Sequence, residues 1–285
     1  MNRSIAIIGA SGLLGQAFVR YFEKKNTRIA LVSRTPLQLS SNNFVHYTAD
    51  INDLVKIDEV VKDYDIIINC TGQITYPINE CLVLNSTGIL NLVKLVKKYE
   101  KHLIHFSSVT VYGTNRQVDE TTTLNPESVY GALKAAAELL IINELNQYCI
   151  MRVSNLYGPY QMKGIISYLL RSYQSNSPEL HFNNDGSLRR YYLHTDDLVE
   201  ITDDFIKSGS EGVYNVVGPE KLTVKELISI AQRELKYKFF PTYTTDSPVE
   251  NIDTIDSDKL QKEISYEYKY SLANFFRDVR ANEKL

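Results

Sequence analysis

Cysteine is scarce in this chain, and its three copies, Cys70, Cys81 and Cys149, do not have the spacing of metal ligands. An odd number of cysteines in 285 residues argues against a disulfide framework and favours a reducing compartment. No apolar run approaches the ~20 residues of a membrane-spanning helix, and no charged leader with an apolar core opens the sequence. The sequence therefore predicts a cytoplasmic protein with no membrane partner.

The balance of charge excludes another class of partner. The chain has 31 basic and 34 acidic residues and a formal net charge of −3, so it has no bulk attraction to nucleic acid. Its five histidines form no cluster with carboxylates at metal-ligand spacing, and we expect no metal site. Repeats and low-complexity tracts are also missing, which indicates a continuously folded chain.

The first half of the chain does contain a regular alternation of short β-rich runs and helix-period segments. The β-rich runs lack apolar/polar alternation, which is typical of a parallel sheet covered on both faces by helices. The sequence therefore predicts an α/β fold of the Rossmann type, a doubly wound parallel sheet that binds ligands at the carboxyl ends of its strands. The predicted strands are Ile5–Ile8, Arg28–Val32, Ile66–Asn69, Leu103–Ser107 and Ile150–Val153, and the helical segments lie around Ile57–Lys62, Asn85–Lys98 and Val129–Leu145.

A glycine-rich loop follows the first predicted strand and opens the first helix. Gly9, Gly12 and Gly15 allow a tight turn, a close approach of the backbone to a pyrophosphate, and close packing of helix on strand. The N–H groups at the start of that helix then face the phosphates. The loop predicts dinucleotide binding, and its other members at the cofactor are Ser11, Leu13 and Leu14.

The end of the second predicted strand bears on which dinucleotide is used. NAD-binding enzymes usually place an Asp or Glu there to hold the ribose 2′-hydroxyl, whereas this chain has Ser33 and Arg34. Ser33 can hydrogen-bond a 2′-phosphate and Arg34 can pair with it. We therefore favour NADP(H), with NAD(H) as the alternative if Arg34 is only a solvated loop residue.

A tyrosine and a lysine share one face at the start of a predicted helix. Tyr130 and Lys134 are four residues apart, so the phenol and the ammonium can point into one site. The ammonium and an oxidised nicotinamide both stabilise phenolate, which otherwise forms only near pH ~10. Ser108, at the carboxyl edge of the sheet, can hydrogen-bond a substrate oxygen. This order of motifs predicts acid–base chemistry by Tyr130.

Further residues lie where the dinucleotide is expected to pass. Asp50 and Ile51 are placed to hold the adenine edge, and Asn85 either orients Lys134 through water or only caps its own helix. The residues that follow the strand Ile66–Asn69 are Cys70, Thr71 and Gly72.

The second half of the chain is less regular. After residue 159, segments rich in turn-forming residues separate the short predicted elements. One helix, Val224–Leu235, is preceded by Thr223, which has Glu226 as its capping-box partner. We expect residues 1–160 to form the dinucleotide-binding domain, with a later return segment near residues 186–200. Residues 161–285 are expected to form mostly a smaller substrate-binding lobe.

Taken with these motifs, the sequence resembles the extended short-chain dehydrogenase/reductases of the NAD-dependent epimerase/dehydratase family through most of its length. The resemblance implies that Ser108, Tyr130 and Lys134 are catalytic, with Tyr130 and Lys134 also at the cofactor. It further implies that Asn155 and Arg190 bind the diphosphate of a nucleoside-diphosphate sugar. The segments that carry it are 105–113, 129–134 with Glu138, 151–159, 189–197 and 213–218.

Two departures from the family pattern bear on the reaction. Members that dehydrate sugars typically carry an Asp-Glu pair directly after the catalytic hydroxyl residue, where this chain has Val109 and Thr110. Neither side chain can act as acid or base for elimination of water, and Val109 is not the cysteine typical of the double epimerase-reductases. We expect Val109 and Thr110 to contact the substrate. The reactions that remain possible are reduction of a 4-keto group and epimerisation.

We therefore expect an NADPH-dependent reductase of a nucleoside-diphospho-4-keto-6-deoxysugar, in nucleotide-sugar (surface polysaccharide) biosynthesis. The alternatives are an NAD(P)-dependent nucleotide-sugar epimerase and a non-catalytic dinucleotide-binding regulator. By the same resemblance we expect a homodimer that pairs through the helices at Asn85–Lys98 and Val129–Leu145. The helix face with Ala132, Ala135, Ala136, Leu139 and Leu140 forms either that seam or simple core.

Overall fold

The computed structural model describes residues 3–25, 27–38, 43–73, 75–244 and 251–282. These residues form a seven-stranded sheet in the order β11-β7-β5-β4-β1-β2-β3, with all neighbouring strands parallel. Both faces of its inner strands are buried, as their continuous apolar sequences require. The predicted Rossmann-type fold is confirmed. The strands are β1 (Ile5–Ile8), β2 (Ile29–Ser33), β3 (Phe44–Thr48), β4 (Ile66–Asn69), β5 (His102–Ser108), β7 (Tyr148–Val153) and β11 (Gly212–Val216).

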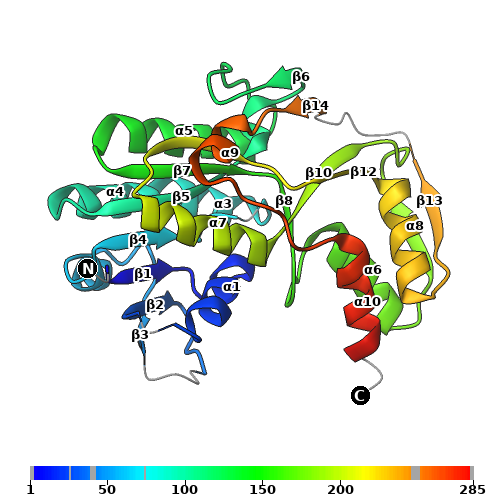
Figure 1. Ribbon diagram of the computed structural model, residues 1–285, viewed down its shortest axis with the longest axis horizontal. Helices are drawn as coiled ribbons and strands as arrows, with labels where there is room; N and C mark the ends of the chain where they lie inside the picture. Colours follow the sequence, from blue (N-terminus) through cyan, green and yellow to red (C-terminus); the bar gives the residue numbers. More distant parts are fainter. Residues whose placement is uncertain (1–2, 26, 39–42, 74, 245–250, 283–285) are drawn as a thin grey trace.

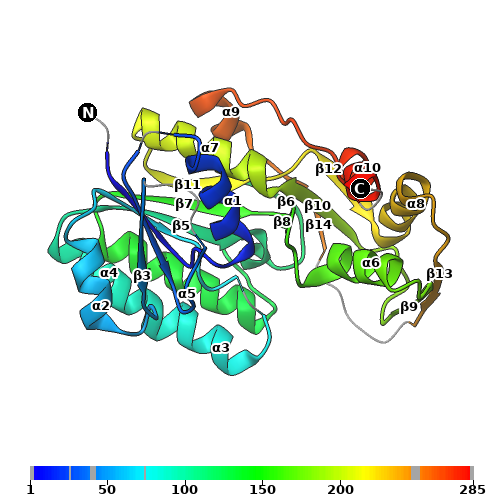
Figure 2. The same cartoon turned by 90° about the horizontal axis from the view of Figure 1, so that it is seen from below.

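Helices cover the two faces of this sheet in separate layers (Figure 2). On one face lie α1 (Leu13–Phe22), α7 (Thr195–Ser208) and α9 (Asp258–Ile264), whose apolar side chains share one buried cluster with the strands. On the other face, α2 (Leu54–Val61), α4 (Ile89–Lys98) and α5 (Val129–Glu144) form a second cluster. α3 (Ile78–Val83) and a π-helical turn (Leu84–Gly88) precede α4.

A smaller lobe stands beyond the carboxyl ends of the strands (Figure 1). Its centre is the sheet β12-β10-β8, built from β8 (Asn155–Tyr157), β10 (Arg189–His194) and β12 (Glu220–Thr223). α6 (Gly164–Gln174), α8 (Val224–Leu235) and α10 (Leu272–Asn282) supply a third apolar cluster. Two further strand pairs are β9 (Glu179–Phe182) with β13 (Phe240–Tyr243), and β6 (Asn115–Val118) with β14 (Ile252–Ile255).

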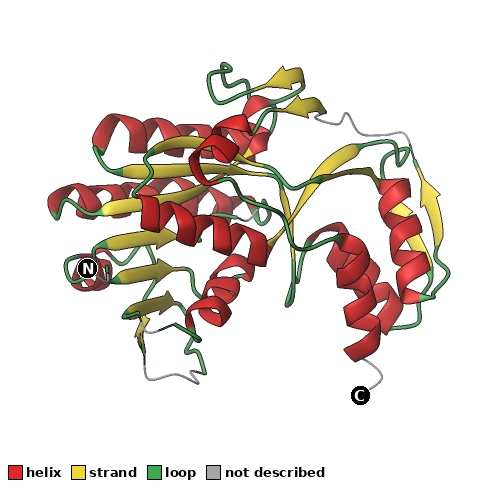
Figure 3. Cartoon of the chain, viewed as in Figure 1, coloured by secondary structure: helices red, strands yellow, loops and turns green. Residues whose placement is uncertain are grey.

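The chain passes between the two parts more than once. After β10 it returns to the parallel sheet as α7 and β11, and it does so again as α9 before ending in the lobe as α10 (Figure 3). α8 begins at Thr223, where the predicted capping box with Glu226 is present. No helix in the described part of the chain is both long and apolar enough to cross a membrane.

Parallel register brings the strand ends to one edge of the sheet. Ile8 pairs with Val32 and with Asn69, and Asn69 pairs with His105. Ser108 pairs with Val153 farther along the same edge. The loops that follow these strands therefore meet where the smaller lobe faces the sheet.

Candidate functional site

The glycine loop fits a dinucleotide pyrophosphate. Gly9 has a φ of +88°, and a Cβ on Gly15 would lie 2.2 Å from the carbonyl oxygen of Gly9. α1 can therefore start this close to the loop only with glycine at position 15. Gly12 is the N-cap of α1 and has no side chain to bond the first N–H groups of the helix. These groups can take an anionic phosphate.

The groups after β2 already have partners within the chain. The Ser33 hydroxyl donates to the carbonyl oxygen of Thr35 at 2.6 Å and lies 2.8 Å from Nε2 of His46. Arg34 donates to Glu80 of α3 at 2.9 Å, and its side chain is 61% exposed. An exposed ion pair contributes little, so a 2′-phosphate can compete with Glu80 for the guanidinium.

The adenine-edge residues lie after β3. The Asp50 carboxylate accepts the backbone N–H and the side-chain amide of Asn52, at 2.9 and 2.7 Å. Ile51 is buried, and its Cγ2 would touch a Cβ on Gly88 at 2.8 Å. Glycine at position 88 therefore lets this loop lie close to the π-helical turn before α4.

The loop after β4 is held from both sides. Asn69 accepts the N–H and the hydroxyl of Thr71, at 3.0 and 2.7 Å. Gly72 has a φ of +75° and packs against Asn85, whose amide donates to the carbonyl oxygens of Gly72 and Cys81. Asn85 thus fixes the loop; no described hydrogen bond joins it directly to Lys134. Cys70 is buried beside Thr71.

Tyr130 and Lys134 lie in the first two turns of α5. Ser128 is the N-cap and accepts the N–H of Gly131. A Cβ on Gly131 would lie 2.8 Å from the carbonyl oxygen of Thr110, so glycine lets α5 approach the turn after Ser108. Lys134 Nζ lies 5.9 Å from the centre of the Tyr130 ring. The helix therefore brings the phenol, the lysine and the β5 end together.

Burial dominates the electrostatics of this pair. It raises the pKa of Tyr130 above its ordinary value, while a hydrogen bond with Ser108 lowers that pKa and the Cys81 thiol raises it. Burial lowers the pKa of Lys134 to about 7, against smaller opposing effects of Cys81, Glu138 and Cys70. Lys134 donates to the carbonyl oxygen of Phe106 at 2.9 Å. A buried lysine with a pKa near neutral pH and a buried phenol are typical of acid–base sites.

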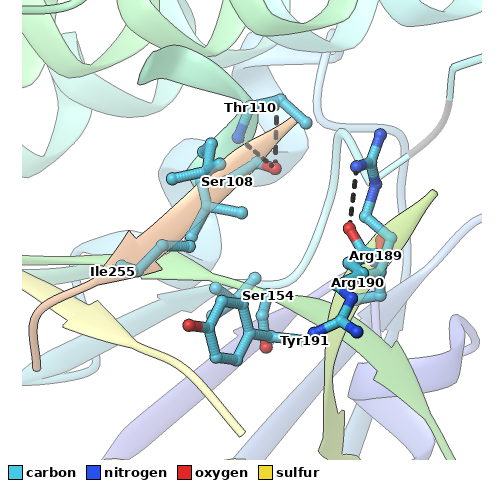
Figure 4. Close-up of a pocket in the computed structure, with 11 residues that line it drawn as sticks. Ser108, Thr110, Ser154, Arg189, Arg190, Tyr191 and Ile255 are labelled. Carbon is cyan, nitrogen blue, oxygen red and sulfur yellow. Dashed lines mark hydrogen bonds between the residues drawn. The ribbon is translucent and has the colours of Figure 1, made fainter. Parts of the chain in front are cut away.

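A pocket lies between the end of β5, β8 and β10, under β14 (Figure 4). Thr110 donates its N–H and its hydroxyl to Ser108 Oγ, at 3.3 and 3.0 Å. The arginines of β10 lie across from this pair. The five residues predicted to bind substrate, Ser108, Val109, Thr110, Asn155 and Arg190, all line the pocket, together with Val153, Ser154, Arg189, Tyr191, Ile252 and Ile255.

Sequence reasoning missed several residues at the site. Gln73, after Gly72, accepts the Tyr130 hydroxyl at 2.8 Å and donates to the carbonyl oxygen of Phe106 at 2.7 Å. Ile252 and Ile255 reach the pocket from a strand more than 100 positions away from Ser108 and Tyr130 in the chain. Gln73 could have been found from its place shortly after the end of the strand Ile66–Asn69. The pairing of β6 with β14 has no local sequence pattern that would predict it.

A buried ion pair connects α5 to the neighbouring strand β7. Glu138 accepts Nη2 of Arg152 at 2.7 Å, and the two side chains are 0% and 5% exposed. Arg152 also donates to the Tyr112 hydroxyl at 2.8 Å, and Tyr112 donates to Asn215 at 2.7 Å. The network joins α5 to β7 and β11. Within the described residues no group of three or more His, Cys, Asp or Glu side chains is arranged to hold a metal ion.

Comparison with known proteins agrees with this architecture. The sequence matches the NAD dependent epimerase/dehydratase family over residues 5–217, most of its length. The chain belongs to this family. A relative from Dictyostelium discoideum, a dTDP-D-glucose 4,6-dehydratase, is 26% identical over 251 residues. That alignment covers 75% of this chain and 58% of the relative, so it spans less than two thirds of the relative's length.

Two solved structures of nucleotide-sugar enzymes show the same fold. A UDP-glucose 4-epimerase from Thermotoga maritima, solved with UDP-glucose, superposes with a TM-score of 0.86 at 21% identity, covering 99% of both chains. A dTDP-glucose 4,6-dehydratase from Bacillus anthracis, in complex with NAD, gives a TM-score of 0.86 at 24% identity, covering 99% of this chain and 97% of the other. The fold extends through both the parallel sheet and the smaller lobe.

Proposed function

We propose that the protein is an NADPH-dependent reductase of a nucleoside-diphospho-4-keto-6-deoxysugar. The observation that carries this proposal is the lining of the pocket at Ser108, the residue that hydrogen-bonds Tyr130; Tyr130 and Lys134 are not themselves among the residues that line it. Its described lining residues include Ser108 and Thr110 but neither aspartate nor glutamate. Elimination of water from a sugar needs an acid and a base besides the tyrosine, whereas reduction needs one proton donor. The site therefore favours reduction over the dehydration that several relatives catalyse.

In the proposed reaction, a reduced nicotinamide dinucleotide held by the glycine loop and Lys134 would supply the hydride for the sugar's C4 carbonyl carbon. Tyr130 gives its phenolic proton to the carbonyl oxygen, which becomes a hydroxyl. Ser108 donates a hydrogen bond to the same oxygen while negative charge develops on it. Lys134 holds the nicotinamide ribose and stabilises the phenolate left on Tyr130 until it is reprotonated from solvent.

The smaller lobe is proposed to bind the rest of the substrate. Arg190 pairs with the diphosphate and Asn155 hydrogen-bonds it, because both line the pocket from β10 and β8. Val109 and Thr110 face the sugar from the turn after β5. Orientation of the ring against these walls sets which face of C4 receives the hydride.

Arg34 carries the proposed preference for NADPH. Arg34→Ala should weaken NADPH binding about tenfold, the order expected from losing one charge-assisted phosphate contact, and leave NADH binding almost unchanged. Fluorescence titration of both cofactors measures this. Glu80→Gln is the matched control, since it frees the same guanidinium and should keep or tighten NADPH binding. Equal weakening of both cofactors by Arg34→Ala would place the guanidinium away from the 2′-phosphate.

A second function, nucleotide-sugar epimerisation with retained NAD, is favoured by one observation. The Ser33 hydroxyl hydrogen-bonds Thr35 and His46, and Arg34 pairs with Glu80. Both groups that were predicted to bind a 2′-phosphate therefore have other partners. The solved epimerase with UDP-glucose shares the fold. The two functions differ in one respect: a reductase consumes NADPH, and an epimerase consumes no cofactor.

We also propose that the protein is a homodimer through α4 and α5. Ala132, Ala136 and Leu139 are exposed along one stripe of α5, and Leu90 is exposed on α4, while Ala135 is buried. Leu139→Glu should convert the dimer to monomer, because it places a charge in an apolar contact. Sedimentation velocity measures this, with Val55→Glu on α2 as an exposed control. A wild-type protein that sediments as a monomer contradicts the proposal.

A further inference from the structure

Gln73 joins the catalytic tyrosine to the carbonyl group that holds the catalytic lysine. Its Oε1 lies 2.8 Å from the Tyr130 hydroxyl, and its Nε2 lies 2.7 Å from the carbonyl oxygen of Phe106. Lys134 donates to that same oxygen at 2.9 Å. A continuous set of hydrogen bonds therefore runs from the phenol through the amide and the β5 carbonyl to the ammonium.

The direction of these bonds follows from the chemistry of the groups. A backbone carbonyl oxygen only accepts hydrogen bonds, so the amide nitrogen of Gln73 must face Phe106. The amide oxygen then faces Tyr130, and an amide oxygen cannot donate. The phenol must therefore donate to Gln73, which it can do only while it carries its proton.

Few other groups act on this phenol. Among the described residues, Ser108 bonds it from the end of β5, the charge of Cys81 on α3 acts on it, and Lys134 Nζ lies 5.9 Å from the centre of its ring. Ser108 and the charged form of Lys134 favour phenolate, whereas a thiolate at Cys81, like the Gln73 oxygen, disfavours it. Of these described groups around the phenol, Gln73 is the one that accepts its hydrogen bond, at 2.8 Å.

We propose that Gln73 is a positioning residue that holds Tyr130 in its protonated, proton-donating form and so favours carbonyl reduction over alcohol oxidation. Oxidation of a sugar hydroxyl, the first step of a family epimerase or dehydratase, begins with a phenolate that takes the hydroxyl proton. Reduction begins with a neutral phenol that gives its proton away. This inference rests on the proposed role of Tyr130 as proton donor, and it names the group that sets the direction.

The test is the ionisation of Tyr130 in the enzyme without substrate. Protein labelled with ¹³C at the tyrosine Cζ is titrated by NMR, and Tyr130→Phe identifies the signal. Gln73→Ala should lower the pKa of Tyr130 by about one unit, because water in the vacated space can donate to phenolate. Gln73→Glu should raise this pKa, because a carboxylate repels phenolate. At the highest pH at which every variant remains folded, phenolate should decrease in the order Gln73→Ala, wild type, Gln73→Glu.

Ser108→Ala provides a control of opposite sign to Gln73→Ala, since it removes a bond that favours phenolate and should raise the pKa of Tyr130. A second readout is the pH profile of alcohol oxidation, whose alkaline rise should move to lower pH in Gln73→Ala and to higher pH in Gln73→Glu. Equal phenolate fractions in all three proteins would overturn the inference. The NMR titration needs no turnover, so its failure is distinguishable from failure of the proposed reaction.

Discussion

Replacement of Tyr130 by phenylalanine is expected to lower kcat about 10²–10⁴-fold, the usual contribution of a positioned proton donor. The phenyl ring keeps the packing of the first turn of α5 but removes the hydroxyl that bonds Gln73 and Ser108. Dinucleotide affinity should change little, because the glycine loop and Lys134 are left in place. Steady-state turnover and a separate cofactor titration measure the two effects independently.

Tyr160→Phe is the matched control for this variant. Tyr160 is 67% exposed on the smaller lobe and does not line the pocket of Ser108, so its hydroxyl should be dispensable for turnover. A Tyr130→Phe enzyme that keeps most of its rate would show that another group supplies the proton.

The second large effect is expected on stability. Glu138→Gln should reduce the free energy of unfolding by about 3–5 kcal/mol, because it leaves the Arg152 guanidinium buried without its counter-charge. Guanidinium chloride unfolding, monitored by circular dichroism, measures the change in midpoint. Turnover per folded molecule should fall less than stability does, since Glu138 acts on the site only through the position of α5.

The same helix offers a control for this prediction. Glu144, at the end of α5, pairs with Lys97 at 2.8 Å, and both side chains are largely exposed. Glu144→Gln should therefore cost less than ~1 kcal/mol. The double replacement of Glu138 and Arg152 by methionine should recover most of the loss, because no buried charge remains. Equal costs for Glu138→Gln and Glu144→Gln would contradict the role of burial.

The parallel sheet was predictable because its strands are short, apolar on both faces and separated by helices of regular period. β1 and β4 coincide with their predictions, and β2 and β5 differ from theirs by one residue at each end. β3, with only Phe44 buried, does not have that pattern. Edge strands such as β3 rely on one buried face, and the sequence around it carries no other signal.

The site was predictable to the extent that function leaves a local motif. The glycine loop and the Tyr130–Lys134 pair each lie within one turn of helix or loop, so spacing alone places their atoms together. Gln73 meets Tyr130 across 57 positions of the chain, and only the sheet register brings β4 beside β5. His46, which contacts Ser33, and Glu80, which pairs with Arg34, likewise come from β3 and α3, so the sequence of the loop after β2 does not reveal them.

The part of the pocket lining that comes from β14 was not predictable for the same reason. Ile252 and Ile255 come from β14, which pairs with β6 across more than 130 positions. Each strand has only four residues, and neither is apolar throughout. Their pairing depends on the lobe being in place, which is a tertiary rather than a local property.

The most direct test of the proposed function is whether the purified, cofactor-stripped enzyme consumes a reduced dinucleotide. The enzyme is titrated with NADPH and NADH and then supplied with a panel of nucleoside-diphospho-4-keto-6-deoxyhexoses while nicotinamide absorbance is followed. Preferential binding of NADPH and its stoichiometric oxidation with one of these sugars is the predicted result. Tight binding of NAD with interconversion of sugar epimers and no net oxidation or reduction of cofactor would contradict it, and would identify the protein as an epimerase.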